Sequence, residues 1–137
     1  TEVLVEQYSA LAADGGFLLY VNASGAFGLD AKTIGSLSYK SNNSVADVCD
    51  GNPHHIAAVI SGNVVTLYLD GVVTTKNNSN DLTGATYINT PMNIGANRSG
   101  ADTATLHYSG VLDEIALYNT ALSADRILAH YNAGVGA

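Results

Sequence analysis

The chain has 137 residues and a formal net charge of −7, with five Lys and Arg against twelve Asp and Glu. This length fits one domain, no apolar run approaches the roughly 18 residues that cross a membrane, and so few cations make nucleic acid and anionic lipid poor partners. Only 12% of the residues are charged, and Asn, Ser and Thr supply the polarity instead, which is typical of extracellular or virion surfaces. The first ten residues lack the basic start and long apolar segment of a secretory leader.

Alternating apolar and polar residues predict that β-strands dominate the chain. In chain order, the expected early strands are 2–8, 16–22, 25–30, 35–40, 54–60 and 63–69. Asp70-Gly71 follows, and this dipeptide indicates a type I′ hairpin turn because both central positions of that turn need positive φ. A polar loop is then expected at 75–90, followed by a strand at 92–96. A second polar loop at 97–106 precedes the last expected strand, at 107–118.

The only helical pattern lies at the end of the chain. Ser123 is a candidate N-cap, and Gly134 offers a left-handed stop. Between them, Ile127, Leu128 and Tyr131 form one apolar face. Many short strands and one terminal helix that docks its apolar face on a sheet predict an all-β sandwich.

Two segments resemble a known family. HHIAAVISGNVVTLYLDG (54–71) is similar to the central hairpin of laminin-G-like jelly-roll domains, which belong to the concanavalin A-like lectin/glucanase superfamily. NIGANRSG (93–100) followed by YSGVLDEIALYNTALSADRI (108–127) is similar to the ending of such domains, and the two segments occur in the expected order. The resemblance implies that residues 1–137 form a single two-sheet antiparallel β-sandwich (jelly roll) with a short C-terminal helix.

The sequence departs from the family's pattern in two ways. Pro53 stands where the family usually has Trp, and the chain has no Trp at all. The strand or two that usually precede the segment matched by 2–8 are not visible. Either a longer parent chain contains these first strands, or a neighbouring chain completes the sheet and makes assembly part of the fold, since an open sheet edge is otherwise a liability.

The adjacent acids Asp113 and Glu114 raise the question of catalysis. Neighbours on a strand point to opposite faces, so these two cannot flank one glycosidic bond, which needs carboxylates roughly 5–10 Å apart around a common site. The resemblance implies that a hydrolase of this superfamily would carry Glu-x-Asp-x-x-Glu on one strand. No Glu-x-Asp, Asp-x-Glu or Glu-x-Glu occurs in the chain, so we expect a domain that is not an enzyme.

Asp113 alternates with Val111, Ile115 and Leu117, which predicts that its carboxylate points inward. An inward carboxylate is costly unless donors or a cation satisfy it. In one interpretation Asp113 accepts backbone N–H groups and pins the sandwich edge. In the other it ligates a structural Ca²⁺, as the resemblance implies, because several superfamily members hold calcium with an Asp at a comparable place.

A second acidic cluster, Asp47 and Asp50 in the stretch 46–52, could also hold Ca²⁺, although its spacing is not that of an EF-hand loop. The alternative is that both residues form Asx-turns in a polar loop. The neighbouring pair His54 and His55 resembles a metal site, but strand neighbours point apart, so one zinc ion could not easily hold both. No cofactor other than calcium is expected.

Three tyrosines are candidate ligand-binding residues, because flat aromatic rings stack on sugars and the many Asn side chains offer hydrogen bonds. The alternation predicts that Tyr20 and Tyr68 face away from the core, whereas Tyr39 shares the parity of Leu37. Each of the three could instead be ordinary sheet surface or core.

Two functions follow as hypotheses. The first is a non-catalytic recognition or adhesion module on an extracellular, secreted or virion surface, which binds a glycan, the matrix or a surface protein. The second is a structural or decoration module that contacts other domains or chains of a larger assembly, for example a phage capsid or tail, and takes no small ligand. Neither involves nucleic acid or insertion into a membrane.

Overall fold

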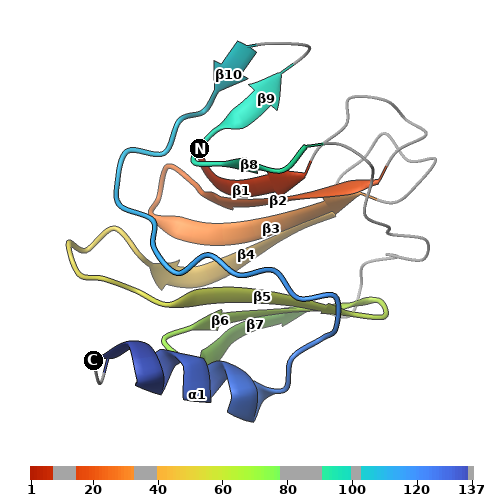
Figure 1. Ribbon diagram of the computed structural model, residues 1–137, viewed down its shortest axis with the longest axis vertical. Coiled ribbons are helices and arrows are strands. Elements are labelled where there is room, and N and C mark those ends of the chain that lie inside the picture. Colours follow the sequence, from red (N-terminus) through yellow and green to blue (C-terminus); the bar gives the residue numbers. More distant parts are fainter. Residues whose placement is uncertain (8–14, 33–39, 78–90, 100–102, 136–137) are drawn as a thin grey trace.

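The computed structural model describes residues 1–7, 15–32, 40–77, 91–99 and 103–135, and it consists of antiparallel strands with one helix (Figure 1). The elements are β1 (Glu2–Gln7), β2 (Gly16–Val21), β3 (Ala26–Lys32), β4 (Lys40–Asp47), β5 (Ile56–Ser61), β6 (Val64–Leu69), β7 (Val72–Asn77), β8 (Asn93–Ile94), β9 (Asn97–Ser99), β10 (Thr103–Thr105) and α1 (Ala124–Val135). The predicted fold class, a two-sheet antiparallel β-sandwich with a short C-terminal helix, is confirmed.

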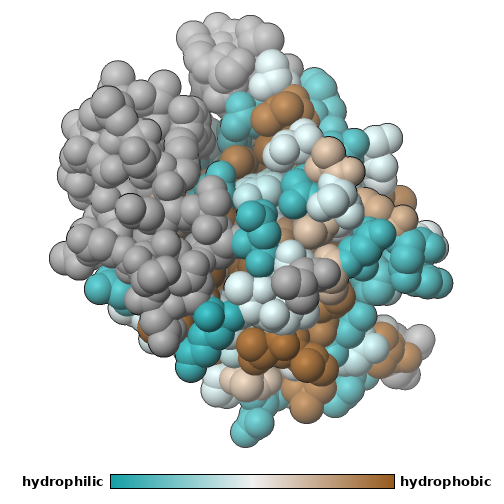
Figure 2. Space-filling model, turned by 180° about the vertical axis from the view of Figure 1, so that it is seen from behind, coloured by the Kyte–Doolittle hydropathy of each residue, from teal (hydrophilic) through white to brown (hydrophobic). Residues whose placement is uncertain are grey.

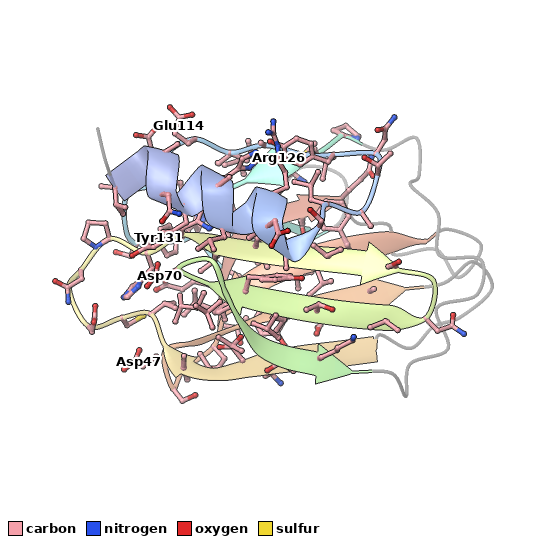
Figure 3. The ribbon with its side chains drawn as sticks, turned by 90° about the horizontal axis from the view of Figure 1, so that it is seen from below. Asp47, Asp70, Glu114, Arg126 and Tyr131 are labelled. Carbon is pink, nitrogen blue, oxygen red and sulfur yellow. The ribbon has the colours of Figure 1, made fainter. Side chains whose placement is uncertain are left out.

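The described strands form a five-stranded sheet in the order β4-β3-β2-β1-β8, a three-stranded sheet in the order β5-β6-β7, and a two-stranded sheet of β9 and β10. At one edge of the sandwich β4 contacts β7, and the Thr75 hydroxyl donates to the Asn43 carbonyl across that edge at 3.0 Å. At the other edge the sheets end in β5 and β8. Residues 110–122, which we call the strap, run along that second edge to the helix (Figures 1 and 3).

The core lies between the two sheets. Alternate residues of the strands supply it, and its fully or largely buried members are Leu4, Val21, Phe27, Leu29, Ala31, Val65 and Leu67. Two side chains from outside the strands, Tyr108 and Leu112, pack against this cluster from the open edge. Burial of apolar area at about 25 cal/mol per Å² is the main favourable contribution to such a fold.

The β6–β7 hairpin forms as predicted. Asp70 and Gly71 have φ values of 51° and 79°, the positive values that a type I′ turn requires. Helix α1 lies against this hairpin. A Cβ added to Gly71 would stand only 2.7 Å from Leu128 Cδ1 and 3.4 Å from Tyr131 Cδ1, so the two elements are in close contact at this glycine. Ile127 is buried, whereas Leu128 is partly exposed, so the predicted apolar face is confirmed with Ile127 at its centre. The helix continues through Gly134 to Val135, so the predicted stop at Gly134 is wrong.

The predicted strand at 107–118 is wrong. This segment has no strand in the structure, and Glu114 adopts a left-handed φ of 50° that interrupts an extended chain. The expected inward face is also wrong: Val111 is 90% exposed, Ile115 and Leu117 are exposed, and Leu112 packs on the core instead. Asp113 therefore lies at the surface rather than inside.

Two further segments differ from the expected pattern. Residues 40–47 form the eight-residue strand β4, and β9 and β10 form a hairpin in the expected loop 97–106. Both are rich in Ser, Thr and Asn, so they lack the apolar alternation by which strands are recognised in a sequence. The predicted strand 35–40 falls almost entirely outside the described residues. The one helix of the described residues is too short to cross a membrane.

Candidate functional site at the loop rim

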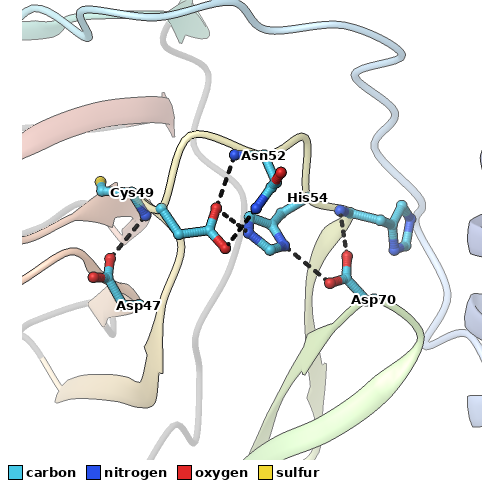
Figure 4. Close-up of polar contacts among 7 residues, drawn as sticks. Asp47, Cys49, Asn52, His54 and Asp70 are labelled. Atoms are coloured by element: carbon cyan, nitrogen blue, oxygen red, sulfur yellow. Dashed lines mark hydrogen bonds and ion pairs between the residues drawn. The ribbon is translucent and has the colours of Figure 1, made fainter.

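Three loops meet at one end of the sandwich, the end where the strand pairs β2–β3, β4–β5 and β6–β7 are connected (Figure 1). We call residues 22–25, 47–55 and 70–71 the rim. Figure 4 shows the polar contacts of the second and third loops, where Asp50, His54 and Asp70 follow one another in a chain of hydrogen bonds. The rim is the part of the described surface in which most predicted polar site residues come together.

The first rim loop is held by the side chain of Asn22. Its Oδ1 accepts hydrogen bonds from the Ser24 amide at 2.9 Å, the Ser24 hydroxyl at 2.7 Å and the Ala26 amide at 3.1 Å. Asn favours such turns because its short side chain can bond to the backbone that follows it. The Val48 amide donates to the Gly25 carbonyl at 2.9 Å, which joins this loop to the second.

The predicted calcium candidates Asp47 and Asp50 each form an Asx-turn in the second loop. Asp47 Oδ1 accepts from the Cys49 amide at 2.8 Å, and Asp50 Oδ1 accepts from the Asn52 amide at 2.8 Å. Asp50 Oδ2 accepts from the Asn52 side-chain amide at 3.0 Å. These donors from Asn52, followed by His54, lower the pKa of Asp50 to about 2. The carboxylates therefore fix the shape of the loop.

His54 connects the second rim loop to the third. Its Nδ1 lies 2.9 Å from Asp70 Oδ2, and its Nε2 lies 3.1 Å from Asp50 Oδ1. Both ring nitrogens can donate only in the imidazolium form. The hydrogen bond to Asp70 accordingly raises the pKa of His54 above its usual value, and the bond to Asp50 adds to this, against an opposing effect of burial.

His55 has the opposite environment, although it is the next residue. Its amide donates to Asp70 Oδ1 at 2.9 Å, but its ring packs near Tyr131 of α1, with the ring centroids 6.3 Å apart. Burial lowers the pKa of His55, and the nearby His130 lowers it further, while Asp70 acts in the opposite direction. Within the part of the chain that the structure describes, the two rings have no common partner atom.

The described carboxylates of the rim do not form a preformed coordination site for a metal ion. Among the described residues, no group of three or more His, Cys, Asp or Glu side chains is arranged to hold a metal ion. Asp113, the third calcium candidate, lies in the strap, and its Oδ1 accepts from the Glu114 amide at 2.8 Å. Calcium binding by Asp47, Asp50 or Asp113 therefore stays a prediction with no preformed site to support it.

The three candidate tyrosines have different positions. Tyr20 lies on the face of the five-stranded sheet opposite the core, as predicted, but it is only 7% exposed and its hydroxyl donates to Asn43 Oδ1 at 2.8 Å. Tyr68 is also only 7% exposed. A ring so deeply buried offers little flat surface to a sugar. Tyr39 lies outside the described residues.

Two carboxylates on the outer face of the five-stranded sheet were not identified from the sequence. Glu6 pairs with Leu18 and Leu18 with Asp30 in successive strands, so both acids are in one cross-strand row, about 10 Å apart at the backbone. Glu6 is completely buried and accepts from the side-chain amides of Asn93 at 2.9 Å and Asn97 at 2.6 Å. This buried carboxylate binds β8 and β9 to β1, a role that only the register reveals.

Comparisons with known proteins agree with this architecture. Residues 2–128 match the family described as the concanavalin A-like lectin/glucanases superfamily. The fold is also similar to a crystal structure of an S-layer domain-containing protein from Clostridium thermocellum, with a TM-score of 0.50 and 23% identity over 92% of this chain. The chain spans 63% of that structure. No curated protein matches the sequence. Because the family match covers nearly the whole chain, this protein belongs to the concanavalin A-like lectin/glucanase superfamily.

Proposed function

We propose that the chain is a non-catalytic recognition module at an extracellular surface and that it binds carbohydrate through the rim. The observation that carries the proposal is the rim itself: its loops are held by side-chain hydrogen bonds, and it exposes polar groups that suit sugar hydroxyls, among them Ser24, Asp47, Asp50 and Asn52. A preformed site of this kind loses little conformational entropy on binding.

Four further facts support the proposal. The superfamily is named for lectins as well as glucanases, and the similar solved structure comes from a protein described by its S-layer domain, which fits a location at a cell surface. The chain's low content of charged residues suits a neutral, hydroxyl-rich ligand. The outer-face row is poorly placed for hydrolysis, because one of its two acids, Glu6, is completely buried with amide donors on both oxygens.

A glycan array tests the proposal. The wild-type domain is expected to bind a defined subset of glycans, and the double substitution of Ser24→Ala and Asn52→Ala is expected to weaken that binding at least tenfold. Asn63→Ala is the matched control, because Asn63 is exposed in the turn between β5 and β6, at the opposite end of the sandwich from the rim, and should bind like the wild type.

Two additional arms of the same array address the alternatives. Addition of EDTA tests the predicted calcium: lost binding that returns with Ca²⁺ would support Asp47, Asp50 or Asp113 as ligands, and Asp47→Ala, Asp50→Ala and Asp113→Ala would then identify which of them. Binding to no glycan, combined with a stable assembly in analytical ultracentrifugation, would contradict the proposal and favour the structural module instead.

A further inference from the structure

The strap exposes more apolar surface than a free surface segment normally does. Val111, Leu117, Tyr118 and Ile115 are 90%, 52%, 43% and 42% exposed within eight residues. Isolated apolar residues on a surface are normal, but a contiguous exposed group usually marks an interaction site. The opposite face, seen in Figure 2, mixes hydrophilic with hydrophobic residues.

Among the described residues, the backbone of the strap makes one hydrogen bond, from the Glu114 amide to the Asp113 carboxylate at 2.8 Å. The strand beside the strap at the open edge is β5. In the described part of the chain, β5 pairs with β6 on one side and with no strand on the other. An unpaired backbone beside an edge strand is a template for an additional extended segment.

Glu114 holds the strap in a strained conformation. Its φ of 50° is left-handed, which costs a non-glycine residue about 1–2 kcal/mol. No ladder or core contact accompanies that conformation, because Glu114 is exposed. Relaxation of Glu114 to an extended φ would restore regular alternation to the strap, so the strain favours a change towards a strand when a partner supplies hydrogen bonds.

The charge around the strap determines which partner fits. Asp113 and Glu114 are exposed between the apolar residues, and Asp125 follows in the first turn of the helix, with Arg126 as the nearby cation. A second copy of the chain would bring the same carboxylates and a further net charge of −7. Like charges facing each other across an interface oppose association.

We propose that the strap is a docking surface for an extended segment of a partner protein in which apolar residues alternate with Lys or Arg. The segment pairs its backbone with the strap, places its apolar side chains on the face of Val111, Ile115 and Leu117, and presents its cations on the opposite face, which carries Glu114. This surface is separate from the rim, and the proposal does not depend on carbohydrate binding.

The test uses a fluorescent ten-residue peptide of alternating Val and Lys as the probe, with fluorescence anisotropy as the readout. The wild-type domain is expected to bind it, and the double substitution of Ile115→Ser and Leu117→Ser should weaken binding at least tenfold. The matched control is Val72→Ser, because Val72 is an exposed apolar residue of β7, the strand at the other edge of its sheet. The affinity of the Val72→Ser variant for the peptide should stay within twofold of the wild-type affinity.

Two further measurements make the result decisive. Asp113→Asn with Glu114→Gln should weaken binding at low salt and much less at high salt, and a Val-Glu peptide should not bind. Hydrogen exchange of the wild-type domain should slow within residues 110–122 when the Val-Lys peptide is added. The proposal is overturned if the control loses binding equally, if exchange in the strap does not change, or if the apolar substitutions abolish self-association of the domain rather than peptide binding.

Discussion

The rim and the strap are both irregular in secondary structure, yet they differ in how their polar groups are satisfied. In the rim, side chains such as Asn22, Asp50 and Asp70 accept hydrogen bonds from the backbone that follows or faces them. In the strap, apolar side chains and backbone groups face solvent together. Segments without helix or strand can therefore differ physically. The rim is held in one shape by its own hydrogen bonds, whereas the strap has exposed groups that a partner could bind.

The largest expected effect on stability comes from a substitution in the rim. Asp70→Ala should lower the free energy of unfolding by about 3 kcal/mol, because it removes the acceptor for the His55 amide and for His54 and places Ala at a positive φ. Asp70→Asn, which keeps an acceptor oxygen and tolerates that φ, should cost about 1 kcal/mol. Urea denaturation measures both. Equal losses in the two variants would show that the hydrogen bonds do not determine the stability of the rim.

The next largest effect comes from comparing two neighbouring residues of the strap, one packed on the core and one exposed. Leu112→Ala should lower the free energy of unfolding by about 2 kcal/mol, because Leu112 packs on the core from the open edge. Val111→Ala, at the adjacent residue with 90% exposure, should change it by less than about 0.5 kcal/mol. A similar loss in both variants, again by urea denaturation, would mean that the strap is packed as a whole and not anchored at one residue.

The two histidines of the rim should give opposite pH dependences. The raised pKa of His54 means that its stabilising bonds are fully present below the usual His pKa of about 6.5 and are lost as the pH rises through the folded-state value. The lowered pKa of His55 means that its burial destabilises the fold as the pH falls below about 6.5.

Thermal melts of single variants separate these contributions. His54→Gln should be more destabilising at pH 5.5 than at pH 8.5, whereas His55→Gln should lose less stability between pH 7 and pH 5 than the wild type does. The same pH profile for both variants would contradict the assignment of the two rings to different environments.

The smallest effect concerns the strained residue of the strap. Glu114→Gly should raise the free energy of unfolding by about 0.5 kcal/mol, because the relief of left-handed strain slightly exceeds the entropic cost of a glycine in the unfolded chain. Glu114→Ala, which keeps a Cβ at the same φ, should give no such gain. A loss with Gly in urea denaturation would mean that Glu114 makes a stabilising contact in the strap.

The sequence predicted the parts of the fold that depend on local chemistry. Alternation located β1, β2, β5 and β6, and Asp70-Gly71 specified its hairpin because few other dipeptides accept two positive φ values. The Asx-turn interpretation of Asp47 and Asp50 was one of the two that the loop 46–52 allowed, and the side-chain bonds to Cys49 and Asn52 agree with it.

The parts that failed depend on non-local contacts. Along residues 107–118 the predicted inward face is reversed, because Leu112 packs on the core while Val111, Ile115 and Leu117 are exposed. Strand β4 carries few apolar residues, and pairing with β3 defines it. The row of Glu6 and Asp30 exists only through the register of three strands, which no single stretch of sequence contains.

The small residue in the β6–β7 turn has a consequence for the order of folding. Gly71 provides the space that Leu128 and Tyr131 occupy, so α1 can settle only after the turn has taken its final shape. The turn closes within a few neighbouring residues and forms early, whereas the helix has to return from more than fifty residues along the chain. Docking of α1 is therefore a late event in folding, which follows closure of the β6–β7 turn.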